Sequence, residues 1–297
     1  MKLNVMASAL AALSFTLTAR AELPAKTASP YLGAIAVDAA TGDVLFEDQA
    51  DVQGYPASVI KLMDLLIVLE KIEEGALKLD DPITISAEVS KIGGSQVYLK
   101  EKEVFPVEDL LYAMMVQSAN DAATALATYV GGTKDGFVEL MNEKAKALGM
   151  SNTELHSVHG LPPGPGQEPD VTTARDLALL CRELLKRPDT LKYTSTMERG
   201  FRDDTFIMRN HNPLLRTVDG CDGLKTGYFS KAGYAVAATA QRKGDRVIVV
   251  ILGSPDKNIR GEKAAELLAK GFLEIGKRKA EREKTAGAPP STPNAQR

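Results

Sequence analysis

The chain has 297 residues, of which 44% are hydrophobic and 25% charged, and its formal net charge is −3. This is the composition of an ordinary soluble globular protein, long enough for one large domain or two small ones. A mildly acidic chain with no basic cluster and only 5% aromatic residues is a poor nucleic-acid binder. Nucleic acid is therefore excluded as a partner.

Residues 1–21 have the form of an export signal. Lys2 gives a positive start, a mostly apolar segment runs from about Val5 to Leu17, and Ala19-Arg20-Ala21 matches a small-x-small cleavage site. The apolar run is too short to span a bilayer as a permanent helix, although an uncleaved anchor is the alternative interpretation. We therefore expect a signal peptide at 1–21 and a periplasmic or extracellular mature protein in the cell envelope.

Export would place both cysteines, Cys181 and Cys221, in an oxidising compartment. A disulfide between them is an open alternative, because Cys181 falls in a helical pattern and Cys221 in a turn. His156 and His159 are spaced like metal ligands, but no third ligand stands nearby, and the sequence contains only 3 histidines. We expect no metal and no cofactor, and the same shortage argues against a Ser-His-Asp triad.

The hydrophobic patterns predict strands near both ends of the chain and helices between them. The predicted strands are a hairpin at 31–47, a short strand at 83–85, and three late strands at 223–229, 233–240 and 246–252. The predicted helices lie at 58–69, 107–116, 121–130, 137–148, 171–186 and 261–279. Residues 281–297 resemble a disordered tail, so one domain is expected at 22–280.

Strands that follow one another through short turns pair in an antiparallel manner. We therefore expect a mixed α/β fold of the α+β type, in which one antiparallel sheet joins both chain ends and is flanked by helices. The block of helices between the early hairpin and the late strands would form an inserted helical subdomain. A functional cleft is expected where this insert meets the sheet edge.

The most unusual stretch is 58–69, where every residue from Val59 onward is apolar except Lys61 and Asp64. A helix that is apolar nearly all round is usually buried, and lysine is rarely buried without a reason. With Pro56 in the first helical turn, Ser58 and Lys61 would share one face. Burial lowers the pKa of a lysine, which would make Lys61 a base for the Ser58 hydroxyl. The alternative is that Ser58 caps the helix and Lys61 pairs with Asp64.

Two further short motifs are suggestive only in combination with this one. Ser118-Ala119-Asn120 lies between two predicted helices, where it could be a simple turn. Lys225-Thr226-Gly227 begins a predicted strand, where Gly227 would let a substrate backbone approach closely. A second Ser-x-x-Lys pattern, residues 254–257, has no apolar helix behind it and is discarded.

Ser-x-x-Lys, Ser-x-Asn and Lys-Thr-Gly in this order are the signature of penicillin-binding proteins and class A β-lactamases. The chain resembles the D-alanyl-D-alanine carboxypeptidase family of low-molecular-mass penicillin-binding proteins over roughly residues 31–271. Further stretches that look like the family are Pro56-Ala57-Ser58, Val107–Tyr112, Gln117–Ala123, His159-Gly160-Leu161, Thr173–Asp176, Asn210–Leu215 and Asp222–Gly227. The resemblance implies the β-lactamase/DD-peptidase-like fold, peptidoglycan stem peptides as substrate, and acylation by β-lactam antibiotics.

The resemblance also assigns roles by motif. Ser58 would be the nucleophile, Lys61 its base, and Ser118 the relay of a proton to the leaving D-alanine. The remaining matches would bind substrate. Asn120 would orient the acyl chain, Gly227 would let the substrate backbone approach, and the backbone N–H groups of Ser58 and Tyr228 would form the oxyanion hole. Lys225, Thr226 and Arg260 would bind the carboxylate. A solvent-exposed arginine at a helix start is the alternative for Arg260.

The resemblance has departures that leave alternatives open. Phe229 stands where many family members have threonine, which bears on carboxylate recognition. The chain also ends soon after the last predicted helix, without the β-rich domain and membrane anchor of many members, as in shorter members that look like DD-endopeptidases. A DD-endopeptidase and a non-catalytic peptidoglycan-binding protein are therefore alternatives to the carboxypeptidase. A class A β-lactamase is disfavoured, because Glu168 lacks an asparagine four residues on.

Overall fold

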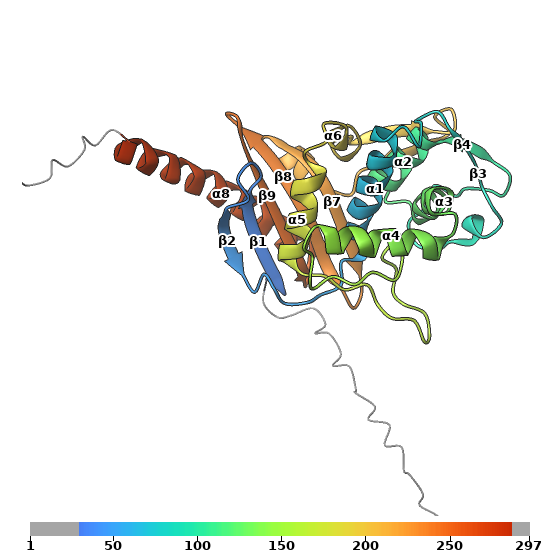
Figure 1. The fold of residues 1–297 in the computed structure, drawn as a ribbon, viewed down its shortest axis with the longest axis horizontal. Coiled ribbons are helices and arrows are strands. Elements are labelled where there is room, and N and C mark those ends of the chain that lie inside the picture. The colour runs from blue at the N-terminus through green and yellow to red at the C-terminus, as the bar shows by residue number, and fades with distance from the viewer. Residues whose placement is uncertain (1–29, 287–297) are drawn as a thin grey trace, which may run out of the picture.

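The computed structural model describes residues 30–286, so the expected signal peptide and the last residues of the expected tail lie outside the described part. Its centre is a five-stranded antiparallel sheet in the order β2-β1-β9-β8-β7 (Figure 1). The strands are β1 (Gly33–Asp38), β2 (Val44–Asp48), β7 (Cys221–Phe229), β8 (Gly233–Arg242) and β9 (Asp245–Ser254). The expected sheet that joins both chain ends is confirmed.

Helices cover both faces of this sheet. One face packs on α8 (Lys257–Ala286), through the alternate residues Val236, Val249 and Ile251 of β8 and β9. The other face packs on α1 (Lys61–Glu73) and α5 (Ala174–Leu184). Burial from both sides explains why residues 247–252 of β9 form a continuous apolar run.

The inserted helical subdomain lies beyond α1, as Figure 1 shows. It contains α2 (Val107–Val116), α3 (Asn120–Gly131) and α4 (Lys134–Ala147). The small elements are η2 (Val89–Lys91) and two small antiparallel sheets. One sheet pairs β3 (Pro82–Thr84) with β4 (Val104–Pro106), and the other is the hairpin of β5 (Glu198–Phe201) and β6 (Phe206–Arg209). Two short helices, α6 (Asp189–Thr194) and α7 (Leu214–Thr217), precede β7 in the chain.

Three expectations need correction. Ser58 does not lie in a regular α-helix begun by Pro56, because Ala57–Ile60 form a 3₁₀ turn (η1) and α1 starts only at Lys61. The last helix continues from the expected end at residue 279 to Ala286, so the first residues of the expected tail are helical. The β5–β6 hairpin and the two short helices were not predicted.

Residues 30–286 contain neither a disulfide between the two cysteines nor a membrane-spanning helix. Cys181 is buried in α5 and Cys221 begins β7, and both are free thiols. Across residues 30–286 no helix combines the length and apolar character needed to cross a membrane.

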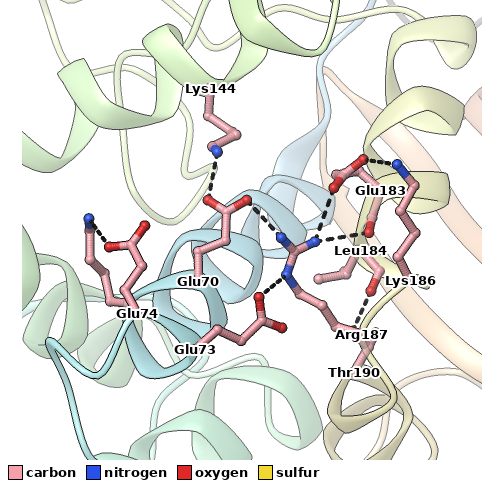
Figure 2. A network of polar contacts seen from close by, with 10 residues as sticks. Glu70, Glu73, Glu74, Lys144, Glu183, Leu184, Lys186, Arg187 and Thr190 are labelled. Atoms are coloured by element: carbon pink, nitrogen blue, oxygen red, sulfur yellow. Dashed lines mark hydrogen bonds and ion pairs between the residues drawn. The ribbon is translucent and has the colours of Figure 1, made fainter.

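An ion-pair network ties the C-terminal end of α1 to its neighbours (Figure 2). Arg187 donates to Glu70 at 3.0 Å, to Glu73 at 3.1 Å and to Glu183 at 3.2 Å, and Lys144 of α4 reaches Glu70 at 2.6 Å. The Arg187 side chain is only 14% exposed, so solvent screens these pairs less than surface pairs. The network therefore fixes the helix that carries Lys61.

We predict that Arg187→Ala lowers the free energy of unfolding by about 2 kcal/mol, because it leaves Glu70 and Glu73 side by side without their shared cation. Urea unfolding measures this loss. The control is Lys71→Ala, which removes an exposed ion pair with Glu74 at the same helix end and should change stability by less than about 1 kcal/mol. Equal losses in the two variants would contradict the role given to Arg187.

Candidate active site

Ser58 and Lys61 lie together at the start of α1. The 3₁₀ turn presents Ser58, and Lys61 follows it as the first residue of the α-helix. Lys61 has no exposed surface, and its Nζ lies 2.9 Å from the Oγ of Ser58. The pair therefore has the contact that proton transfer from a serine hydroxyl to an amine requires.

Two more acceptors surround the amine of Lys61. The side-chain Oδ1 of Asn120 lies 2.7 Å from Nζ and the backbone carbonyl of His159 lies 2.8 Å away. The amide nitrogen of Asn120 donates in turn to the carbonyl of Gly93 at 2.8 Å. Lys61 is therefore held by Ser58 in the preceding turn and by two acceptors from distant parts of the chain.

Burial determines the protonation of this cluster. Loss of water lowers the pKa of Lys61 to about 7, and the nearby Asp64 partly opposes this shift. Neither carboxylate oxygen of the fully buried Asp64 has a hydrogen-bond partner among the described residues, and burial raises the pKa of that carboxyl well above its usual range. Since an unpaired buried charge is costly, both groups are driven toward their neutral forms. Lys61 is thus available as a base near neutral pH.

A second serine–lysine pair lies opposite the first. Ser118 sits between α2 and α3 in a left-handed conformation (φ +60°), and its Oγ lies 2.9 Å from the Nζ of Lys225 on β7. Lys225 is only 3% exposed, and burial together with the charges of Lys61 and Arg260 lowers its pKa. An anion bound beside Lys225 would restore its charge, because an opposite charge favours the ammonium form.

Gly227 brings the edge strand against the serine turn. A Cβ atom at this position would lie 2.6 Å from the carbonyl oxygen of Pro56 and 3.0 Å from the backbone nitrogen of Ser58. The sequence predicted that Gly227 makes room for a substrate backbone, whereas in the structure it makes room for the turn that holds the nucleophile. The backbone of β7 can therefore lie directly beside Ser58.

The loop that contains His159 and Gly160 completes the site around Lys61. Gly160 has φ +73°, and a Cβ there would lie 2.1 Å from the carbonyl oxygen of Ala57. Asp170 holds the same loop by accepting hydrogen bonds from the backbone of His156 and from the backbone and hydroxyl of Ser157. This arrangement aims the His159 carbonyl at Lys61. A backbone acceptor leaves no residue-type signal, so the sequence did not predict this contact.

Arg260 lies in the first turns of α8 and is only 6% exposed, so the alternative of a solvent-exposed arginine is wrong. Its Nε atom is buried and has no hydrogen-bond partner among the described residues. It is close enough to Lys225 for its charge to lower the pKa of that lysine. Thr226 is 7% exposed and Tyr228 is 54% exposed on the same strand.

The structure therefore brings together most of the residues singled out in the sequence. Ser58 and Lys61 come from η1 and the start of α1, Asn120 and Ser118 from the inserted helices, and Lys225 from the edge strand. His156 and His159 do not belong to a metal cluster, since no group of three or more potential ligands of the types His, Cys, Asp and Glu occurs within residues 30–286. A serine hydroxyl beside a buried lysine amine, with a second buried serine–lysine pair nearby, is the arrangement of a serine acyl-transfer site.

Comparison with known proteins agrees with this class. Residues 19–256 match the family model described as D-alanyl-D-alanine carboxypeptidase. The chain is 33% identical over 242 residues to D-alanyl-D-alanine carboxypeptidase DacF of Bacillus subtilis, covering 80% of this chain and 61% of the relative. It is 37% identical over 245 residues to DacC of Escherichia coli, covering 80% and 60%. The chain thus spans about three fifths of the length of these relatives.

A solved structure is similar to this chain in both fold and sequence. Penicillin-binding protein D2 of Listeria monocytogenes, in its ampicillin-bound form, superimposes with a TM-score of 0.74 at 32% identity, covering 82% of this chain and 97% of that one. This chain belongs to the D-alanyl-D-alanine carboxypeptidase family. The predicted family and the predicted DD-peptidase-like fold are confirmed.

We predict that Gly160→Ala destabilises the protein more than backbone strain alone explains, because the new Cβ meets the Ala57 carbonyl beside the nucleophile. Gly149→Ala is the matched control, since Gly149 has a similar φ of +75° with nothing within 4 Å of its added Cβ. The strain shared by both variants is about 1–2 kcal/mol. Urea unfolding should show an additional loss only for Gly160→Ala, and equal losses would contradict the steric account.

Proposed function

We propose that the protein is an exported serine D-alanyl-D-alanine carboxypeptidase that removes the terminal D-alanine from peptidoglycan stem peptides. The observation that carries this proposal is the fully buried Lys61 amine, whose pKa is lowered to about 7 and which lies 2.9 Å from the Ser58 hydroxyl. The names of the relatives and the ampicillin-bound state of the Listeria protein support the same chemistry. Cell-envelope localisation follows from the export signal expected at residues 1–21.

In the first half of the reaction, Ser58 Oγ attacks the carbonyl carbon of the penultimate D-alanine while Lys61 takes the hydroxyl proton. The backbone N–H groups of Ser58 and Tyr228 stabilise the negative oxygen that forms, an effect commonly worth about 3 kcal/mol of barrier. The C–N bond then breaks as Ser118 passes its hydroxyl proton to the nitrogen of the leaving D-alanine. The proton held by Lys61 is transferred to Ser118, so Lys61 is neutral again. The product is an ester between Ser58 and the shortened peptide.

In the second half, water attacks the ester carbonyl, Lys61 acts again as the base, and Ser58 regains its proton. Asn120 orients the acyl chain through the same amide that bonds Lys61. Lys225, Thr226 and Arg260 bind the carboxylate of the leaving residue, and that carboxylate restores the charge of Lys225. A positive Lys225 in turn disfavours protonation of Lys61, so substrate binding promotes the active form of the base.

β-Lactams would acylate Ser58 by the same first step. We predict that the mature protein is labelled by a fluorescent penicillin, that Ser58→Ala is not labelled, and that Lys61→Ala is labelled about 10²- to 10⁴-fold more slowly. Lys257→Ala is the control, because it alters the second Ser-x-x-Lys pattern, and it should label normally. Label retained by Ser58→Ala would identify a different nucleophile, and no label on folded wild type would favour a non-catalytic peptidoglycan-binding protein.

Product analysis separates the carboxypeptidase from the DD-endopeptidase. The same preparation is incubated with monomeric and with cross-linked muropeptides, and the released products are measured by mass spectrometry. The proposal expects free D-alanine from the monomers and little change in the cross-linked material. Cleavage mainly of the cross-links would assign the protein as an endopeptidase.

A further inference from the structure

The edge strand β7 presents two different faces. Because strand side chains alternate, Thr226 and Tyr228 point to the same side. Their partners on β8 are Val236 and Tyr234, and Val236 belongs to the cluster packed against α8. Thr226 and Tyr228 therefore lie on the α8 side of β7, where Arg260 is also found.

Two tyrosine rings are stacked on this side. The rings of Tyr228 and Tyr234 have centroids 4.2 Å apart and an interplanar angle of 23°. Tyr228 is nevertheless 54% exposed. An exposed aromatic side chain by itself is unremarkable, but a ring stacked on a second ring is held in position and can act as a rigid surface for a ligand.

Arg260 connects this pair to the carboxylate site. Its charge acts on the side chain of Tyr234 as well as on Lys225, so it lies within electrostatic reach of both the ring pair and the lysine. Its buried Nε has no partner among the described residues, as expected of a donor that awaits an anion. A carboxylate between Thr226 and Arg260 would therefore have the rings of Tyr228 and Tyr234 as its neighbours.

We propose that Tyr228 and Tyr234 form a wall of the leaving-group pocket that restricts the leaving residue to one with a small side chain. The inference rests on the proposed function, because it takes the leaving residue to be the one whose carboxylate meets Thr226 and Arg260. With that carboxylate fixed, a larger side chain, or a second peptide in its place, would collide with the rigid ring of Tyr228. The wall thus favours release of free D-alanine over cleavage of cross-links.

The test compares two peptides that differ only in the last residue, one ending in D-Ala-D-Ala and the other in D-Ala-D-Leu. The measured quantity is the ratio of their kcat/KM values. We expect Tyr228→Ala to raise the relative rate for the D-leucine peptide about tenfold or more, because the ring that excludes the larger side chain is gone. Tyr234→Ala should raise the ratio less, since Tyr228 then loses its support but remains present.

Two controls define the result. Tyr228→Phe keeps the ring and should keep the wild-type ratio, and Tyr129→Ala removes a 46% exposed tyrosine from α3 and should leave the ratio unchanged. If both Tyr228→Ala and Tyr234→Ala keep the wild-type ratio of kcat/KM values and still release D-alanine, the proposed role of the two rings is wrong. The proposed carboxypeptidase function would then still stand. A wild type that releases no residue from either peptide and takes up no penicillin would overturn the proposed function, and the wall with it.

Discussion

The structure depends on burying one amine. Lys61 has no exposed surface, and its Nζ is satisfied by Ser58 at 2.9 Å, Asn120 at 2.7 Å and the carbonyl of His159 at 2.8 Å. A charged lysine in such a place would lose its hydration, so burial lowers its pKa to about 7. The apolar residues of α1 exclude water from the Lys61 amine, and the three acceptors replace the hydrogen bonds that the amine would otherwise make with water. The chemistry of the serine follows from these two conditions.

The same cluster explains why the fold has two parts. The acceptor from Asn120 comes from the inserted helices, while Lys225 comes from the edge of the sheet and reaches back to Ser118 in the insert at 2.9 Å. Gly227 lets β7 approach the Ser58 turn closely enough to close the arrangement. Neither part contains a complete site, so the proposed reaction depends on their relative position. The Arg187 network holds one of the elements that set this position.

Sequence reasoning succeeded where side-chain pattern determines structure. The apolar runs and short turns predicted the sheet, the apolar stretch of α1 predicted a buried helix, and the Ser-x-x-Lys spacing predicted that Ser58 and Lys61 lie together. It failed where tertiary contact decides: the short β5–β6 hairpin has little periodicity, and the 3₁₀ turn at Ala57–Ile60 is set by packing against Gly160 and Gly227. The His159 carbonyl could not be foreseen, because any residue carries one. Arg260 was ambiguous until its burial was known.

The most direct test of this account is the titration of the Lys61 amine itself. NMR of protein labelled at the lysine Cε atoms follows each ammonium group with pH, and the signal missing from Lys61→Ala assigns the residue. A buried amine with a lowered pKa should lose its proton as the pH rises through about 7, whereas an exposed lysine does so near 10.4. A Lys61 that titrates with the exposed lysines would be a cation at neutral pH, and it could not be the base of Ser58.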